Sequence, residues 1–344
     1  MFRESTEKVV FMARLLYQML KYGNVKHLIQ YFLIIALITS LGVLSYWVFV
    51  PDKSEASLFE SPIPSFLTIP QNSQIKLLDF WIPFLSSSAS PDEPPTHTAK
   101  SVLIYDLTEK KSLYEHYAKK RLPMASLTKI MTAIIAIENP RPDDRYLVRG
   151  SDLVGEDSMG LLAGEKLTLE ELLYGLMLPS GNDAAEVLAN NYIYGREKFV
   201  EAMNNKAKAL GLTDTNFTNP SGLQGDGVQY TTAYDILVIT RYALENFPLL
   251  KKIVSTYEHE ISATPTHQYY HLYNETNLLT TYPGVKGVKT GYTPEAGMCL
   301  VTYLEYKDHK IIAILLNSEN RREEMRNFLN YSLTSLGITP PEQK

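Results

Sequence analysis

The chain has 344 residues, of which 45% are hydrophobic and 21% are charged, so it suits one large folded domain or two small ones. The formal net charge of −5 argues against a nucleic-acid-binding protein, which usually carries a basic surface. The single cysteine excludes an internal disulfide framework and a multi-cysteine zinc site. This residue, Cys299, lies in the apolar run 298–301, and we expect it in the core.

A run of twenty residues without a charge, YFLIIALITSLGVLSYWVFV, occupies positions 31–50. A helix of this length spans the hydrocarbon core of a bilayer, which is about 30 Å thick. Residues 1–30 carry five basic and two acidic side chains, a net charge of +3 that favours retention of this end in the cytoplasm. We therefore predict a cytoplasmic basic segment at 1–30, a transmembrane anchor at 31–50 and export of everything that follows.

Two alternatives exist for residues 31–50, a cleaved signal peptide and a buried core helix. A signal peptide usually has a shorter apolar region and a small-residue cleavage site, whereas this run ends in the aromatic sequence YWVFV. A core helix would normally show a polar stripe. Both comparisons favour the anchor.

Residues 51–99 are rich in Pro, Ser and acidic side chains, with SSS at 86–88 and PDEPP at 91–95. Prolines at this density interrupt regular structure, so we predict a stalk that holds the exported domain away from the membrane. Its apolar stretch LLDFW, at 77–81, is expected to contact either the bilayer or the domain. The folded domain is predicted at residues 100–340.

The patterns within this domain begin with a strand hairpin at 101–106 and 113–117. Helical patterns follow at 126–138, 168–177, 182–192, 196–210 and 232–246. Strand patterns return at 256–262, 269–274, 285–290, 298–306 and 310–317, and a last helix is predicted at 318–336. Strands at both ends with helices between them predict an α+β domain whose terminal strands meet in one sheet.

Three short patterns in the sequence carry side chains suited to catalysis, and each is weak alone. The positions are S-x-x-K at 126–129 and again at 73–76, S-x-N at 180–182 and again at 318–320, and K-T-G at 289–291. The duplicates show that such short patterns arise by chance, so their context has to separate them.

Ser126 precedes the apolar run IMTAIIAI, which is typical of a buried helix. Residues three apart share a helix face, so Lys129 would lie beside the Ser126 hydroxyl. The dipole at a helix start favours developing negative charge on that oxygen, and a lysine with a lowered pKa can act as its base. The plain alternative is a capping serine and a solvated lysine. Residues 73–76 lie in the predicted stalk, without helical periodicity.

Ser180 follows Leu-Pro and precedes a helix rich in small residues. A Pro-Ser-Gly-Asn turn there can direct its hydroxyl and the Asn182 amide into a cleft, although simple helix capping is the alternative. Ser318, in contrast, is predicted to be the N-cap of the last helix.

Lys289, Thr290 and Gly291 are predicted at the end of a strand bounded by glycines. A glycine just after the strand lets a substrate backbone approach closely. The lysine and the threonine supply a cation and a hydroxyl for a substrate carboxylate. The alternative is a basic strand end followed by a turn.

The three patterns together are more informative than any one of them. They follow the order S-x-x-K, S-x-N, K-T-G, with 54 and 109 residues between their first positions, which is the signature set of penicillin-binding proteins and β-lactamases. Residues 100–325 resemble the serine D-Ala-D-Ala carboxypeptidases, the low-molecular-mass penicillin-binding proteins. Four segments carry this resemblance: ASLTKIMTA, SMGLLAGEKLTLEELLYGLMLPSGNDAAEVLA, FTNPSGL and GVKTGYTPEAGMCLV. The resemblance implies an antiparallel sheet flanked by helices, on the extracytoplasmic face of a bacterial cell membrane.

The resemblance also implies a catalytic role for three side chains. Ser126 would be the acylated nucleophile, Lys129 its base, and Ser180 a proton relay toward the leaving D-alanine. The backbone N–H groups of Ser126 and Tyr292 would form the oxyanion hole. The implied reaction removes the terminal D-alanine from peptidoglycan stem peptides and needs no cofactor or metal.

The remaining implied site residues bind substrate. Asn182 would hold the peptide of the substrate, while Lys289 and Thr290, with Gly291 beside them, would engage its terminal carboxylate. The implied partners are stem peptides ending in D-Ala-D-Ala, and β-lactam antibiotics as covalent inhibitors.

The sequence departs from the family pattern at Ser221 and Tyr292, where many members have histidine. Many members also carry a second, β-rich domain and a C-terminal amphipathic anchor. We expect the N-terminal span to replace that anchor. A D,D-endopeptidase that cleaves cross-links and a penicillin-recognising sensor without turnover are the alternative functions. No E-x-x-L-N segment of a β-lactamase follows S-x-N, and the sequence has no G-x-S-x-G or H-E-x-x-H.

Overall fold

The computed structural model describes residues 81–85, 93–276 and 278–342. The chain divides into two units, and these residues all belong to the second, Gln74–Lys344. The predicted cytoplasmic segment, the predicted anchor and most of the predicted stalk lie outside the described residues. Within the described ranges, no helix is both long enough and apolar enough to cross a membrane.

One antiparallel sheet organises the domain, with the strand order β2-β1-β9-β8-β7. Its strands are β1 (Ser101–Asp106), β2 (Lys111–His116), β7 (Val285–Thr293), β8 (Gly297–Tyr306) and β9 (His309–Ser318). The N-terminal hairpin pairs with the last strand along the whole of β1, so the two ends of the domain meet as predicted. Since β7 is one of the two edge strands, one side of its backbone faces away from the sheet.

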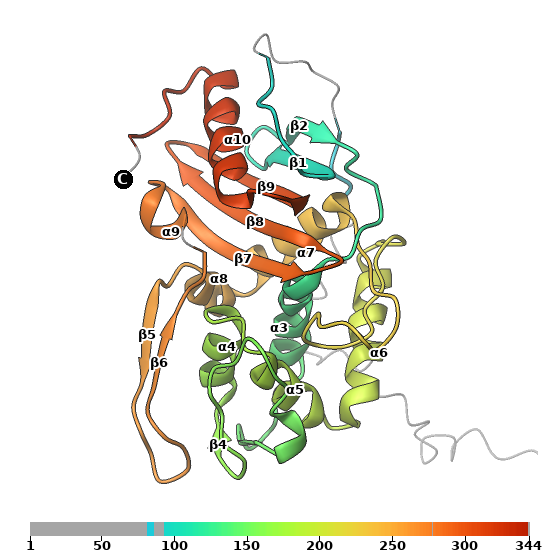
Figure 1. Ribbon diagram of the computed structural model, residues 1–344, viewed down its shortest axis with the longest axis vertical. Coiled ribbons are helices and arrows are strands. Elements are labelled where there is room, and N and C mark those ends of the chain that lie inside the picture. The colour runs from blue at the N-terminus through green and yellow to red at the C-terminus, as the bar shows by residue number, and fades with distance from the viewer. Residues whose placement is uncertain (1–80, 86–92, 277, 343–344) are drawn as a thin grey trace, which may run out of the picture. The chain divides into compact units, whose positions relative to one another are not determined.

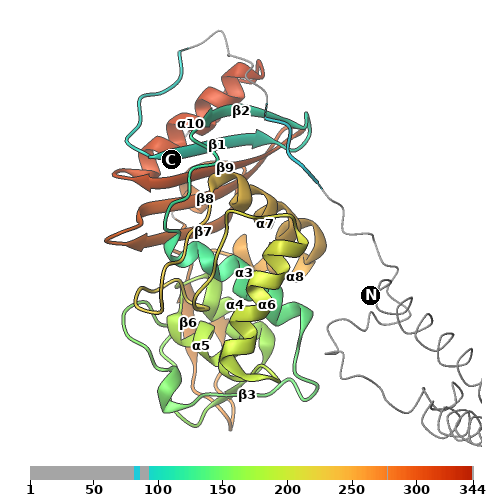
Figure 2. The same cartoon turned by 90° about the vertical axis from the view of Figure 1, so that its right-hand side faces the viewer.

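Helices cover both faces of this sheet (Figures 1 and 2). On one face lies α10 (Arg321–Ser335), while α7 (Ala233–Asn246) and α8 (Pro248–Val254) lie on the other. Successive residues of a strand face opposite sides, and Leu103 and Ile104 accordingly belong to two different apolar clusters. The sheet is therefore buried on both sides, which makes it a stable base for the site.

A helical lobe adjoins the sheet on the side of α7 (Figure 2). It contains α3 (Thr128–Glu138), α4 (Leu169–Met177), α5 (Asn182–Asn190) and α6 (Gly195–Ala209). Helix α3 runs through its centre and is buried on all sides from Thr128 to Ala136. Such a helix has no solvated face, so its lysine is placed in the interior by the apolar residues around it.

The remaining elements are short. They are η1 (Ala125–Leu127), β3 (Tyr146–Leu147), η2 (Gly150–Asp152), β4 (Lys166–Leu167), β5 (Glu258–Ile261), β6 (Tyr270–Tyr273) and α9 (Leu278–Thr281). Strands β5 and β6 form a hairpin that extends beside α4 (Figure 1). Helix α8 begins with Pro248 in its first turn. Proline is common at the start of a helix, but the sequence patterns above predict no helix at this position.

Two expectations about helix and strand ends are wrong. Ser318 does not cap the last helix, because the Asn320 side chain accepts the hydrogen bond from the backbone N–H of Glu323. Ser318 instead donates from Oγ to Glu324. Strand β7 also continues to Thr293, so K-T-G lies within the strand rather than at its end.

The tail of the predicted stalk contacts the domain. The Trp81 ring lies edge-on to the Tyr105 ring, with 5.3 Å between centroids, and the Arg241 guanidinium lies 4.4 Å from the centre of the Trp81 ring. Thr98, also within 51–99, donates from its backbone N–H to Glu324 at 2.7 Å. Both apolar packing and hydrogen bonds therefore fix these residues to the sheet and to its covering helices.

Candidate active site

Ser126 lies in the short turn η1, just before α3, rather than in the first turn of an α-helix as the pattern suggested. Its neighbour Ala125 has φ = 48°, a left-handed conformation that residues with a Cβ seldom adopt. The Thr128 hydroxyl holds this turn by donating to the Ala125 carbonyl at 2.9 Å. The strained turn sets the direction of the Ser126 side chain.

Lys129 is fully buried and lies one turn along α3 from Ser126. Its Nζ donates to Ser126 Oγ at 2.9 Å, to Asn182 Oδ1 at 2.7 Å and to the Ser221 carbonyl at 2.7 Å. Burial lowers the pKa of Lys129 well below its usual value, and the nearby Lys289 lowers it further. A neutral Lys129 amine would donate its N–H groups to Asn182 Oδ1 and to the Ser221 carbonyl. Its lone pair would then be free to accept the proton of the Ser126 hydroxyl.

Ser180 lies two residues before Asn182 and has an unusual backbone conformation. Its φ of 64° is left-handed, and the helix cap of α5 is Gly181, so the capping alternative for Ser180 is wrong. Its Oγ is buried and has no hydrogen-bond partner among the described residues. Leaving a buried hydroxyl unpaired costs about 1–3 kcal/mol, which is tolerable where a substrate group completes the site.

Asn182 begins α5, and the residue after it fixes the loop in front of the site. The Asp183 carboxylate accepts hydrogen bonds from the Ser158 hydroxyl and from the backbone N–H groups of Met159, Gly160 and Leu161. Asn182 itself is 2% exposed and donates from its backbone to the loop. Its own backbone hydrogen bond and the anchored Asp183 next to it therefore hold the Asn182 side-chain oxygen toward Lys129.

The K-T-G residues of β7 lie against the nucleophile turn. A Cβ placed on Gly291 would lie 3.1 Å from the Ser126 backbone nitrogen, so a side chain there would press the strand and the turn apart. Lys289 and Thr290 are buried, whereas the Tyr292 side chain is 60% exposed. Burial lowers the pKa of Lys289 to about 8. The three predicted motifs thus meet at one place, at the free edge of the sheet.

The two duplicate motifs do not contribute. Ser318 is engaged with Glu324, and the S-x-x-K at 73–76 lies outside the described residues. Cys299 is buried as expected, and burial raises the pKa of its thiol to about 11, which makes it unreactive.

Three contributors were not identified from sequence. Ser221 was noted only as a departure from the family pattern, yet its carbonyl accepts from Lys129. The Arg321 guanidinium donates to the Gly291 carbonyl at 2.8 Å, and burial lowers its pKa. Glu275 Oε2 accepts from the Thr290 hydroxyl at 3.0 Å. A single sequence carries no local signal for these long-range contacts.

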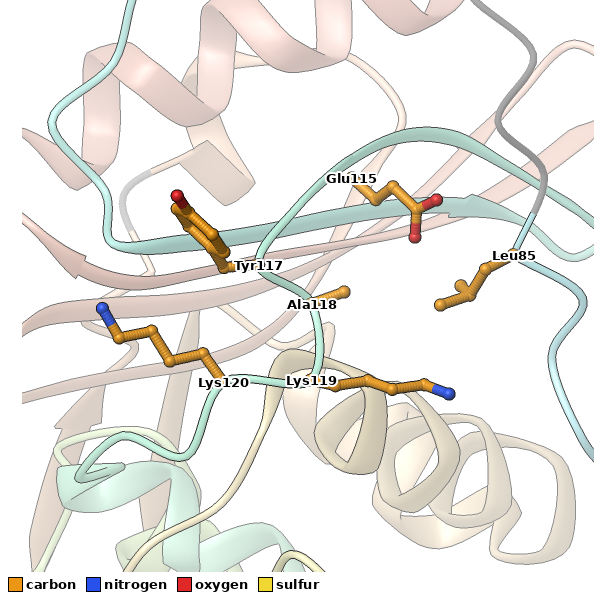
Figure 3. Close-up of a pocket in the computed structure, with 6 residues that line it drawn as sticks. All are labelled: Leu85, Glu115, Tyr117, Ala118, Lys119 and Lys120. Carbon is orange, nitrogen blue, oxygen red and sulfur yellow. The ribbon is translucent and has the colours of Figure 1, made fainter.

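Two other features of the surface are separate from the motif residues. A hollow of about 640 Å³ is lined by Leu85, Glu115, Tyr117, Ala118, Lys119 and Lys120. Its two lysines point in opposite directions, so they do not converge on one ligand (Figure 3). The exposed Glu258, Glu260 and His271 of the β5–β6 hairpin have potential metal-ligating atoms within 4.8 Å of one another, but His271 is already paired with Glu258.

Comparison with known proteins bears on this site. The family model described as D-alanyl-D-alanine carboxypeptidase, Peptidase_S11, matches residues 87–320. The carboxypeptidase DacF of Bacillus subtilis is 36% identical over 236 residues, covering 66% of this chain and 59% of DacF. The D-alanyl-D-alanine endopeptidase of Escherichia coli is 30% identical over 240 residues, covering 68% and 76%.

The same likeness is found among solved structures. The crystal structure of the Streptomyces K15 DD-transpeptidase has 30% identity and a TM-score of 0.66, covering 71% of this chain and all of that protein. The chain spans only 59% and 64% of the first two curated relatives, DacF of B. subtilis and DacD of E. coli. The fold is therefore the penicillin-binding-protein type, with an antiparallel sheet flanked by helices, as expected. From its motifs, its fold and its family match, the chain belongs to the Peptidase_S11 family of D-alanyl-D-alanine carboxypeptidases.

Proposed function

We propose that the protein is a serine-type D-Ala-D-Ala carboxypeptidase, which removes the terminal D-alanine from peptidoglycan stem peptides through a Ser126 acyl-enzyme. The observation that carries this proposal is the Lys129 amine, which joins Ser126 Oγ and Asn182 Oδ1 in a buried site. β-Lactam antibiotics would acylate the same oxygen and act as covalent inhibitors. No cofactor is needed for this chemistry.

Acylation starts when Ser126 Oγ attacks the carbonyl carbon of the penultimate D-alanine. The serine proton passes to the neutral Lys129 amine, and the backbone N–H groups of Ser126 and Tyr292 stabilise the oxyanion, each by about 3–4 kcal/mol. The C–N bond then breaks as the leaving amine receives a proton from Lys129 through the Ser180 hydroxyl. Water attacks the ester by the reverse path, with Lys129 as base, and releases the shortened peptide.

Substrate recognition rests on the strand next to the nucleophile. An extended peptide can add to the free edge of β7, while Asn182 holds its amide from the opposite side. The terminal carboxylate would be met by the Lys289 cation and the Thr290 hydroxyl. Arg321, bonded to the Gly291 carbonyl, adds a second cation behind this strand.

Incubation of the exported domain with a stem pentapeptide ending in D-Ala-D-Ala tests the proposal. Mass spectrometry should detect free D-alanine and the tetrapeptide, and absence of both would overturn the carboxypeptidase assignment.

The likeness to the E. coli endopeptidase supports a second candidate, the cleavage of cross-linked peptides. Faster turnover of a cross-linked dimer than of the pentapeptide would favour it. Labelling by penicillin without any turnover would instead indicate a sensor.

The pH dependence of the reaction should report the charge of Lys289. Burial lowers the pKa of this lysine to about 8, so its positive charge is present below that pH and is lost above it. We expect kcat/KM for a peptide with a free carboxylate to fall above pH 8, by up to about tenfold per pH unit. A C-terminally amidated peptide should not show this alkaline limb. An identical profile for both peptides would contradict the role of Lys289.

We also propose that residues 31–50 anchor the protein once in the bacterial cell membrane, with the catalytic domain outside the cytoplasm. The uncharged run and the +3 segment before it support this topology. Protease added to intact spheroplasts should digest the domain and leave a small N-terminal membrane fragment. A soluble product that begins after residue 50 would instead indicate signal-peptide cleavage.

A further inference from the structure

A carboxylate of the protein itself already binds the hydroxyl assigned to the substrate carboxylate. Glu275 follows β6, and its Oε2 accepts from Thr290 Oγ1 at 3.0 Å. The Thr290 side chain is 4% exposed, so few groups can reach its hydroxyl. A hydroxyl has one proton to donate, so it cannot donate to Glu275 and to a substrate carboxylate at the same time.

The electrostatic surroundings of Glu275 are those expected for a substrate carboxylate. Its negative charge raises the pKa of both Lys129 and Lys289 against the lowering effect of burial, and it also opposes the lowering of the Arg321 pKa. The carboxylate therefore acts on all three basic side chains of the site. When substrate is absent, it balances part of the positive charge of Lys289 and Arg321.

The backbone at Glu275 is fixed while its side chain remains accessible. Its N–H donates to the Leu178 carbonyl at 3.2 Å, and the next N–H, that of Thr276, donates to Asn274 Oδ1 at 2.9 Å. The residue itself is exposed to solvent. The carboxylate can therefore rotate out into water without movement of the chain, which is what an exchangeable ligand requires.

We infer that Glu275 is a specificity-determining residue, an internal competitor that a substrate carboxylate must displace from Thr290. The inference rests on the proposed carboxypeptidase function. With Glu275 bound to Thr290, the site should prefer a free carboxylate over an amide less strongly than the same site without Glu275. If the Glu275 carboxylate leaves the Thr290 hydroxyl free about a tenth to a third of the time, replacing Glu275 by alanine should tighten carboxylate binding about 3–10-fold.

The test compares Glu275→Gln and Glu275→Ala with the wild-type protein on two peptides, one ending in a free carboxylate and one amidated. Glu275→Ala should lower KM for the free-carboxylate peptide about 3–10-fold, and Glu275→Gln, whose neutral amide oxygen is a weaker acceptor for the Thr290 hydroxyl, should lower it less. Both variants should leave kcat little changed and leave the amidated peptide unaffected. Glu109→Gln is the matched control, because Glu109 is an exposed glutamate in the β1–β2 turn and the charge change is the same. It should alter neither peptide.

Two further readouts separate competition from a structural role. In a Thr290→Val background, Glu275→Ala should give a smaller decrease in KM than in the wild type, because the shared hydroxyl is gone and only the effect of the Glu275 charge remains. Loss of the Glu275 charge should also move the alkaline limb of kcat/KM to lower pH, because this charge raises the Lys289 pKa.

The outcomes distinguish this inference from the proposed function. Release of D-alanine by the wild type, with KM unchanged or raised in both Glu275 variants, would overturn the inference and leave the function standing. An equal gain on both peptides would also overturn it, because the effect would not depend on the carboxylate. Absence of D-alanine release by wild type and variants alike would overturn the proposed function itself.

Discussion

Ser126→Ala should abolish covalent labelling by benzylpenicillin and lower D-alanine release by about 10⁴-fold or more, because Ser126 carries the one hydroxyl among the described residues that is bonded to the Lys129 amine. The removed hydroxyl is bonded to Lys129, and the substitution creates no cavity large enough to disturb α3. The thermal midpoint of the variant should therefore stay close to that of the wild type. Intact-mass spectrometry after exposure to penicillin would measure the labelling directly.

Ser73→Ala is the matched control for this experiment. Ser73 begins another S-x-x-K of the chain, so the two substitutions remove the same group from the same four-residue pattern. Labelling should persist in Ser73→Ala. Labelling that persists in Ser126→Ala would contradict the assignment of the nucleophile, whatever the result for Ser73.

The sequence predicted the main elements of the fold because their patterns are strong. The strands at both ends of the domain have continuous apolar runs and pair as β1 with β9. The apolar run after Ser126 predicted the buried helix α3. The weaker predictions failed at element ends, where neighbouring groups compete: Asn320 displaces Ser318 as the cap, and pairing with β8 extends β7 beyond K-T-G.

The same distinction applies to the site. Ser126 and Lys129 are three residues apart, so local geometry brings them together, although Ser126 lies in η1 rather than in α3. Asn182 could be linked to them only through the order of the motifs, and the structure places its oxygen 2.7 Å from Lys129 Nζ. The contacts of Glu275 and Arg321 depend on how a loop and a helix pack around β7, which no local pattern in one sequence encodes.

Gly222 illustrates how much of the site depends on backbone packing. Its φ is +90°, and a Cβ there would lie 2.1 Å from the Ala125 carbonyl oxygen and 3.0 Å from the Ser126 nitrogen. The same carbonyl accepts the hydrogen bond of the Thr128 hydroxyl, which holds the nucleophile turn. An added methyl group therefore has to push on backbone that is already fixed, and the turn carrying Ser126 has to move.

Gly222→Ala should accordingly lower the rate of acylation by about 100-fold, because a displacement of about 1 Å at a reacting atom has that cost. It should also lower stability by about 1–3 kcal/mol, because a residue with a Cβ is strained at this φ. Stopped-flow acylation by a β-lactam and thermal unfolding would measure the two effects.

Gly225→Ala separates the clash from the backbone strain. Gly225 lies in the same loop with φ = +117°, but a Cβ there would meet no atom within 4 Å. This control should lose only the stability that backbone strain accounts for, less than Gly222→Ala, while keeping most of its acylation rate, since nothing pushes against Ala125. Equal losses of acylation in both variants would mean that the loop conformation, rather than contact with the nucleophile turn, limits the reaction. A normal rate in Gly222→Ala would mean that the turn tolerates the displacement and that the position of Ser126 is less restricted than its contacts with Gly222 and Gly291 imply.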